Sequence, residues 1–132
     1  MITEAMIPAM QGAVPGGLST VADDGTPNVS YVSQVYYIDE QHVAISNQFL
    51  GKSIRNIQAN GRATVCIVRP DNLASWYLDL RHIRTETEGE LFDKMQMQLE
   101  VIASMVGMED VFSLRAAEVF RVEAANPIRA SL

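Results

Sequence analysis

Short connections between strand-like segments constrain the fold of this chain more than any other feature. Segments rich in valine, isoleucine, tyrosine and threonine recur along the sequence, and several are joined by only a few turn-forming residues. Asp23-Asp24-Gly25-Thr26-Pro27 has hairpin-turn chemistry, and residues 39–41 form a second tight turn. Parallel strands need crossover connections of about a dozen residues or more, so these connections argue against a Rossmann fold. The pattern predicts antiparallel hairpins, as in a small barrel.

The sequence predicts six strands and two helices. A short helix runs from Lys52 to Ala59 and stops at Asn60-Gly61, which is good helix-ending chemistry. The expected fold class is mainly β, with this short helix after the third strand and a longer helix before the last strand. The strands are expected at residues 16–22, 28–38, 42–46, 62–68, 76–86 and 112–122.

The longer helix follows Thr87, which forms a predicted capping box with Glu90. Gly107 is expected to end this helix, and residues 126–129 are expected to form a loose tail. Its apolar stripe repeats at steps of three and four residues and comprises Phe92, Met95, Leu99, Ile102 and Val106. The methionines in and beside it are predicted to lie in the core or in a subunit interface; they are Met95, Met97, Met105 and Met108.

Composition limits the classes of function. The 132 residues suit a single domain over residues 1–132, with a core at about residues 8–123 and loose termini. The content of 48% hydrophobic and 20% charged residues is ordinary for a globular protein. A membrane span and a secretory signal are not expected, so we expect a cytoplasmic protein. The net charge of −6 argues against binding to nucleic acid or to an anionic membrane.

Few residues have the spacing of a catalytic or metal site. Cys66 is the only cysteine and lies in a strand pattern, which predicts a packed residue rather than a reactive thiol. His42 and His82 have no neighbours in metal-ligand spacing, so both are predicted to be surface residues and no metal site is expected. Trp76 and Tyr77 are either core or interface aromatics or the wall of a flat ligand. No catalytic residue can be assigned.

The strongest signal for a ligand is the predicted helix start at Lys52-Ser53. Unpaired first-turn N–H groups, the helix dipole, an ammonium group and a hydroxyl together suit a phosphate. Lysine at this end of a helix is electrostatically unfavourable unless an anion is bound; the alternative is a solvated surface residue. Gly51-Lys52-Ser53 is not a P-loop, because Ser46 stands where that motif needs glycine.

A resemblance to a known family rests on three segments and two single residues. They are residues 25–35, 42–48 and 59–65, together with Lys52 and Asn56. These resemble the pyridoxamine 5′-phosphate oxidase-like flavin-binding split-barrel family, and residues 80–89 and 114–120 resemble one uncharacterised branch of it. The resemblance covers about residues 8–123. It implies a six-stranded antiparallel split β-barrel and a homodimer with FMN bound at the dimer interface.

The resemblance also implies cofactor-binding residues. Lys52 matches the family lysine that contacts the FMN phosphate, and Ser46 and Asn47 match positions that line the phosphate and the ribityl chain. The strand that meets the flavin ring and the ribityl chain contributes Ser30, Tyr31, Ser33 and Gln34. Ser53 is added to this set from its place at the helix start.

Two departures bear on activity. Ser30 stands near the position where the true oxidases carry a phosphate-binding arginine, and the chain ends without their C-terminal segment rich in tryptophan and arginine. We therefore expect an FMN-dependent oxidoreductase of unknown substrate rather than a vitamin B6 oxidase. The alternatives are a non-enzymatic cofactor-binding or sensor domain, holding flavin, deazaflavin or haem, and a purely structural dimer.

Overall fold

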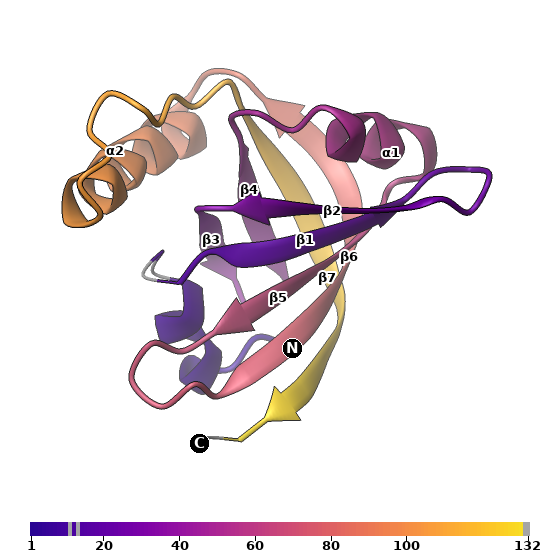
Figure 1. The fold of residues 1–132 in the computed structure, drawn as a ribbon, viewed down its shortest axis with the longest axis horizontal. Helices are drawn as coiled ribbons and strands as arrows, with labels where there is room; N and C mark the ends of the chain where they lie inside the picture. Colours follow the sequence, from indigo (N-terminus) through magenta and orange to yellow (C-terminus); the bar gives the residue numbers. More distant parts are fainter. Residues whose placement is uncertain (11, 13, 131–132) are drawn as a thin grey trace.

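The computed structural model describes residues 1–10, 12 and 14–130, and its strands form one curled antiparallel sheet (Figure 1). The strand order is β2-β1-β5-β6-β7-β4-β3, so β2 and β3 are the edges and the barrel is open between them. The predicted mainly β split barrel is confirmed. The strands are β1 Gly16–Val21, β2 Pro27–Val32, β3 Val35–Asp39, β4 His42–Asn47, β5 Arg62–Val68, β6 Ser75–Glu86 and β7 Ala116–Arg129.

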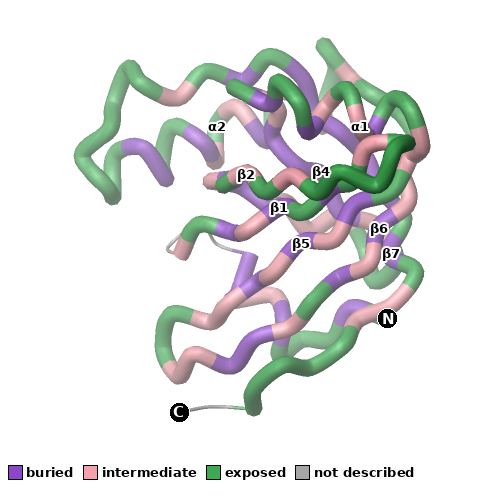
Figure 2. The backbone as a smooth tube through the Cα atoms, turned by 45° about the vertical axis from the view of Figure 1, so that its right-hand side comes forward, coloured by how far each residue is buried: buried purple, intermediate pink, exposed green. Residues whose placement is uncertain are grey.

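In the described part of the chain, three helices accompany the sheet: the 3₁₀-helix η1 Glu4–Met10, α1 Lys52–Asn60 and α2 Glu90–Met105. Alternation along the strands sends Leu18, Val65 and Leu78 into the barrel, where Ile57 of α1 joins them. A second cluster lies on the opposite face of β4, where Met95 and Leu99 of α2 pack against small residues of β4 and β7. Figure 2 shows buried positions alternating with intermediate ones along β5, whereas β4 and the start of β7 are buried continuously. Among the described residues, none of the helices is long and apolar enough to cross a membrane.

The predicted second strand, residues 28–38, is broken into β2 and β3. The break lies at Ser33 and Gln34, where the fully buried Gln34 side chain turns towards α2. Its Nε2 donates to the carbonyl of Met95 at 3.0 Å and to Oε1 of Gln98 at 2.7 Å. This tertiary contact has no local signal in the sequence. It makes seven strands instead of six and places α1 after the fourth strand.

The last strand is later and longer than predicted. β7 begins at Ala116 and continues to Arg129, so the expected loose tail is wrong. Trp76 pairs with Pro127 and Tyr77 with Asn126 along the 12-residue strand β6. A long partner strand accounts for the difference, because pairing with it satisfies backbone groups that would otherwise need water.

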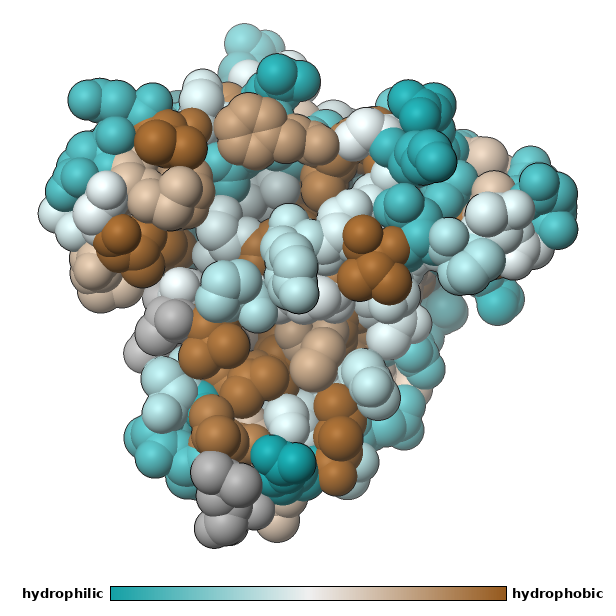
Figure 3. Space-filling view, in the orientation of Figure 1, coloured by the Kyte–Doolittle hydropathy of each residue, from teal (hydrophilic) through white to brown (hydrophobic). Residues whose placement is uncertain are grey.

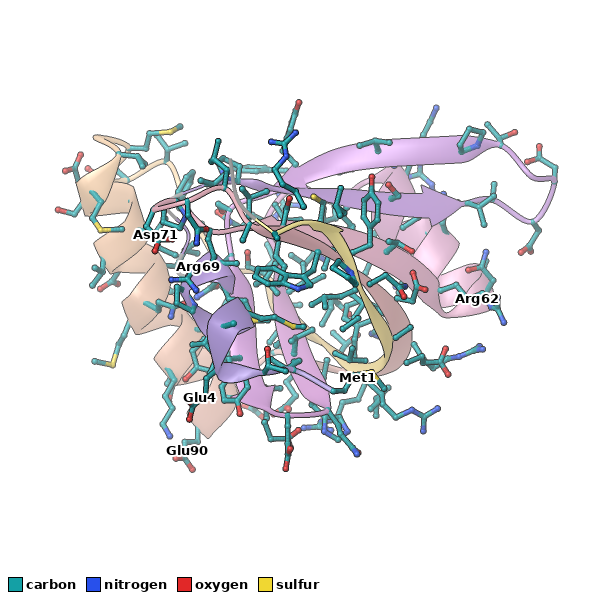
Figure 4. All side chains as sticks on the ribbon, turned by 90° about the horizontal axis from the view of Figure 1, so that it is seen from below. Met1, Glu4, Arg62, Arg69, Asp71 and Glu90 are labelled. Carbon is teal, nitrogen blue, oxygen red and sulfur yellow. The ribbon has the colours of Figure 1, made fainter. Side chains whose placement is uncertain are left out.

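The N-terminal residues also belong to the core. Ile2 and Met6 are buried, so the core reaches further than the predicted start near residue 8. The turn between β5 and β6 contacts η1, because Arg69 donates to the carbonyl of Ala5 at 3.3 Å and pairs with Asp71 at 2.8 Å (Figure 4).

The predicted ends of the two α-helices agree with the structure to different degrees. α1 ends at Gly61 as predicted; this residue has φ 72° and donates its N–H to the carbonyl of Ile57. The predicted capping box of α2 is wrong, because Gly89 is the N-cap and no side chain caps the helix. Val106 follows the last helical residue and is 47% exposed rather than part of the buried stripe.

Candidate functional site

A pocket of about 410 Å³ lies between β2, the end of β4 and the loop that follows it. Its walls contain four of the predicted cofactor-binding residues: Ser30, Tyr31, Ser33 and Ser46. The other lining residues are Pro15, Val32, Gln48, Phe49, Leu50 and Phe112. The lining is therefore aromatic and apolar with a few hydroxyl and amide groups, as expected of small-molecule sites.

The pocket reaches the N-terminus of α1 through Ser30. The hydroxyl of Ser30 lies 2.5 Å from the hydroxyl of Ser53, which is fully buried in the first turn of α1. Nδ2 of Asn28 donates to the same Ser53 hydroxyl at 2.9 Å. Two residues of β2 are thus hydrogen-bonded to the helix start that the sequence singled out.

The N-terminus of α1 has a positive charge and no negative one. Lys52 is the first helical residue and is exposed, the N-cap Gly51 has no side chain, and the first turn contains no acidic residue. Since the helix dipole already makes this end positive, Lys52 is unfavourable here without an external anion.

Gln48 is a central residue that the sequence analysis missed. It is 6% exposed, and its Nε2 donates to the hydroxyl of Ser33 at 2.8 Å and to that of Ser46 at 3.3 Å. Its Oε1 accepts the N–H of Ser113 at 3.2 Å. One amide therefore joins three segments of the pocket wall. Asn28 was also missed, although it precedes Ser30 by two residues and so shares its side of β2.

Two predicted residues, Asn47 and Gln34, lie outside the pocket lining. Oδ1 of Asn47 accepts the N–H of Leu50 at 3.4 Å, which shapes the loop that leads to Lys52. Gln34 is turned towards α2, as described above, so the structure does not bring it to the pocket lining. Trp76 packs against the barrel core, and neither it nor Tyr77 lines the pocket.

A buried carboxylate lies behind the Asn47 loop. Glu118 of β7 is 1% exposed, and its Oε1 accepts hydrogen bonds from Thr85 at 2.5 Å and His82 Nε2 at 3.0 Å. Nδ2 of Asn47 reaches its other oxygen at 3.5 Å. The prediction that His82 is a surface residue is wrong: its side chain is 17% exposed and its ring packs edge-on against Phe120.

The predicted surface position of His42 is confirmed. Its side chain is 31% exposed and its Nδ1 lies 2.8 Å from the exposed carboxylate of Asp39. The N–H of Gln41 and the neighbouring His42 hold the pKa of Asp39 below its ordinary value. Across the described ranges 1–10, 12 and 14–130, no group of three histidine, cysteine or acidic residues could hold a metal ion.

The mouth of the pocket is aromatic and open. Tyr31 is 84% exposed and Phe49 is 68% exposed, and the guanidinium of Arg115 lies 5.8 Å from the Phe49 ring centre. Figure 3 shows this side of the molecule, with hydrophobic side chains standing among polar ones at the surface. The mouth of the pocket therefore presents aromatic surface to solvent.

A larger and shallower hollow, of about 500 Å³, crosses the outer side of β1, β5, β6 and β7. It contains none of the predicted site residues, and its Asp79 already accepts a hydrogen bond from Thr64 at 3.0 Å. We regard the smaller pocket as the candidate site because only that one borders the unbalanced helix start.

Cys66 is half-buried on β5, and burial raises the pKa of its thiol. A raised pKa lowers the thiolate fraction at neutral pH, and the thiolate is the reactive form. We expect a thiol reagent such as dithionitrobenzoate to label the native protein at pH 7.5 at least about tenfold more slowly than the denatured protein. Equal labelling rates for the native protein and for the protein denatured in guanidinium would contradict this prediction.

The family model of pyridoxamine 5′-phosphate oxidase matches residues 2–123. The chain belongs to the pyridoxamine 5′-phosphate oxidase family. Because the match begins at residue 2, it includes the η1 segment that packs into the core. No curated protein matches the chain.

Solved structures with the same fold are distant in sequence. An FMN-binding protein from Syntrophomonas wolfei is 17% identical with a TM-score of 0.77, over 95% of this chain and 86% of that one. HupZ of Group A Streptococcus is 19% identical with a TM-score of 0.73, over 99% and 97%. An F420 reductase is 17% identical with a TM-score of 0.67, over 95% and 98%. At identities this low, the similarity establishes that this chain has the same split-barrel fold as these structures, and nothing beyond the fold.

Proposed function

We propose that this protein binds FMN in the pocket beside α1 and acts as a flavin-dependent oxidoreductase on a substrate other than pyridoxamine 5′-phosphate. The observation that carries the proposal is the hydrogen bond between Ser30 and Ser53, which joins the pocket to the helix start at Lys52. An elongated ligand with an anionic end and a flat apolar end fits such a site. Membership of the family and the FMN-binding relative support this choice of ligand.

The donors at the helix start suit a phosphate. Lys52 supplies a full positive charge, and Ser30, Ser53 and Asn28 supply hydroxyl and amide groups around the first turn of α1. Where the true oxidases carry an arginine near Ser30, this chain offers neutral donors instead. The phosphate is thus held by one side-chain cation together with the helix dipole.

The open half of the pocket suits the flavin ring. Tyr31, Phe49 and Phe112 offer aromatic surfaces, and Gln48 holds the hydroxyls of Ser33 and Ser46 in fixed positions. Bound FMN supplies the electron-transfer chemistry, while the protein supplies placement and exclusion of water.

A second copy of the chain completes the pocket in this proposal. Val29 and Tyr31 form a ridge on the outer side of β2, and the 500 Å³ hollow lies on the same side, because Val29 pairs with Ser19 of the hollow. Two copies related by a two-fold axis place the ridge of each against the hollow of the other. The homodimer then covers the exposed mouth at Tyr31.

One observation favours a second candidate, a non-enzymatic cofactor-binding or sensor domain. Among the described residues that line the pocket, the phenol of Tyr31 is the only side chain of a type that serves as a general acid or base, because none is an acid, histidine, lysine or arginine. General acid–base catalysis needs such a group within hydrogen-bond reach. A domain that only holds a flavin, a deazaflavin or haem does not need one.

Addition of FMN is expected to stabilise the purified protein and to give it a bound flavin absorption band. At FMN concentrations about a hundred times the dissociation constant, the stabilisation is about 2.7 kcal/mol. A thermal-shift series with FMN, riboflavin, F420 and haem measures which ligand binds.

A colourless protein whose melting temperature FMN does not change would overturn the proposal. Binding of F420 or haem alone would favour the second candidate over FMN. With FMN bound, consumption of a reduced nicotinamide cofactor measured at 340 nm separates an enzyme from a binding domain.

A further inference from the structure

Gln48 is a buried amide that is hydrogen-bonded on both of its sides. Its Oε1 accepts the N–H of Ser113 at 3.2 Å, and its Nε2 donates to the hydroxyl oxygens of Ser33 at 2.8 Å and Ser46 at 3.3 Å. These bonds join the end of β4 to the break between β2 and β3 and to the loop before β7. Both serine hydroxyls belong to the pocket lining, so the direction of these bonds matters for what the pocket can hold.

The amide of Gln48 has only one satisfactory orientation. A backbone N–H can only donate, so the atom that faces Ser113 has to be the amide oxygen. In the flipped amide, Nε2 would face the N–H of Ser113, and two donors would meet without an acceptor. Nε2 therefore faces the serines, and each of its two hydrogens is directed to one hydroxyl oxygen.

A hydroxyl oxygen that accepts a hydrogen bond from Gln48 has to send its own proton elsewhere. Within the described residues, the hydroxyls of Ser33 and Ser46 only accept, and neither donates to a protein group. Ser46 is 2% exposed, yet both residues line the pocket. The wall of the pocket therefore offers two hydroxyl donors to whatever the pocket binds.

We infer that Gln48 is a positioning residue that fixes Ser33 and Ser46 as hydrogen-bond donors to the ligand, so that the site selects a flat ring whose edge carries acceptors. Carbonyl oxygens and imine nitrogens are such acceptors, and the ring of FMN carries both. A ring with only C–H groups along this edge leaves two donors without a partner, which weakens its binding. The choice of ring rests on the proposed function, whereas the orientation of the hydroxyls does not.

Exchange of the Gln48 side-chain amide protons with solvent tests the orientation without a ligand. In ¹⁵N-labelled protein, the Gln48 signals are identified by their loss in Gln48→Glu. Both protons are expected to exchange at least about tenfold more slowly than those of Gln58, which is exposed on α1. Ser33→Ala is expected to speed up exchange of one proton of the pair and to leave the other protected. Exchange of both protons as fast as in Gln58 would overturn the inference.

Reversal of the hydrogen bonds tests the consequence for the ligand. Gln48→Glu keeps the size of the side chain and an oxygen for Ser113, but a carboxylate cannot donate. The hydroxyls of Ser33 and Ser46 then donate to this carboxylate and no longer to the ligand. FMN affinity is expected to fall about tenfold or more, because two hydrogen bonds are lost and each contributes about two- to tenfold. Gln41→Glu, on the exposed turn between β3 and β4, adds the same charge and is expected to leave FMN affinity unchanged.

Combined substitutions separate positioning from packing. Ser33→Ala together with Ser46→Ala is expected to weaken FMN binding about tenfold in the otherwise unmodified protein, but less than about twofold in Gln48→Glu, where the donors are already withdrawn. Equal losses in both backgrounds would overturn the role of Gln48. Binding of FMN to Gln48→Glu as tight as to the unmodified protein would overturn it as well.

A pair of substitutions at Ser33 gives the same comparison without any change at Gln48. Threonine and valine have nearly the same shape and differ by a hydroxyl in place of a methyl group. Ser33→Thr is expected to bind FMN about two- to tenfold more tightly than Ser33→Val. Equal affinities would contradict the role of this hydroxyl. If the unmodified protein binds no FMN, the proposed function fails, and the amide exchange alone decides whether Gln48 orients the two hydroxyls.

Discussion

Replacing Lys52 with alanine is expected to weaken FMN binding by about ten- to a hundredfold while leaving riboflavin binding nearly unchanged. A hydrogen bond to a charged group contributes about 1.5–3 kcal/mol, and each 1.4 kcal/mol is about a factor of ten in affinity. Riboflavin lacks the phosphate, so the ammonium group has nothing to bind in that complex. Quenching of flavin fluorescence on titration with protein measures both dissociation constants.

Lys94 provides a matched control because it is the only other lysine in the chain. It is exposed on α2 and pairs with Glu90 at 2.8 Å, so Lys94→Ala removes the same charge away from the pocket. This variant is expected to bind FMN like the unmodified protein. Equal losses of FMN and riboflavin affinity in Lys52→Ala, or equal effects of the two substitutions, would show that Lys52 does not hold the phosphate.

Replacing His82 with alanine is expected to lower the free energy of unfolding by about 3 kcal/mol. The substitution leaves the buried carboxylate of Glu118 without the hydrogen bond to His82 Nε2, and a buried polar group that loses a partner costs about 1–3 kcal/mol, more when it is charged. The bonds from Thr85 and Asn47 remain and offset part of that cost. The edge-on contact with Phe120 is lost as well. Urea denaturation followed by circular dichroism measures the change.

The only other histidine offers the control for this prediction. His42 also pairs with a carboxylate, but both partners are partly exposed, so His42→Ala is expected to cost less than about 1 kcal/mol. The double variant His82→Ala with Glu118→Leu is expected to recover part of the loss, because no charge is then left buried. Equal costs for the two single substitutions would contradict the structural role given to Glu118.

The sequence predicted turns and helix ends correctly where they depend only on residues that are neighbours in the chain. The Asp23–Pro27 turn, the strand at residues 62–68 and the helix from Lys52 to the stop at Gly61 all appear as predicted. Each of these features follows from a few consecutive residues. Ser30, Ser33 and Ser46, which line one pocket, were predicted from the resemblance to the flavin-binding family and not from local chemistry.

The features that were missed depend on residues far apart in the sequence. Gln34 breaks a strand because α2 offers it a carbonyl 61 residues away, and residues 126–129 join β7 because β6 extends far enough to pair with them. His82 is held inside by Glu118, 36 residues later. Alternation along a strand assigned His82 a face but could not show that this face was covered.

By itself the sequence determined the antiparallel strands, the α1 start with its uncompensated charge and the apolar periodicity of α2. These depend on backbone preferences and on the spacing of side chains within one element. Only the tertiary structure decided that Ser53 bonds to β2, that Gln48 joins the pocket walls and that Met97, Val101 and Met105 of α2 are exposed. Those outcomes depend on which elements lie side by side, because a polar group is satisfied, or an apolar face is covered, only by what the fold brings next to it.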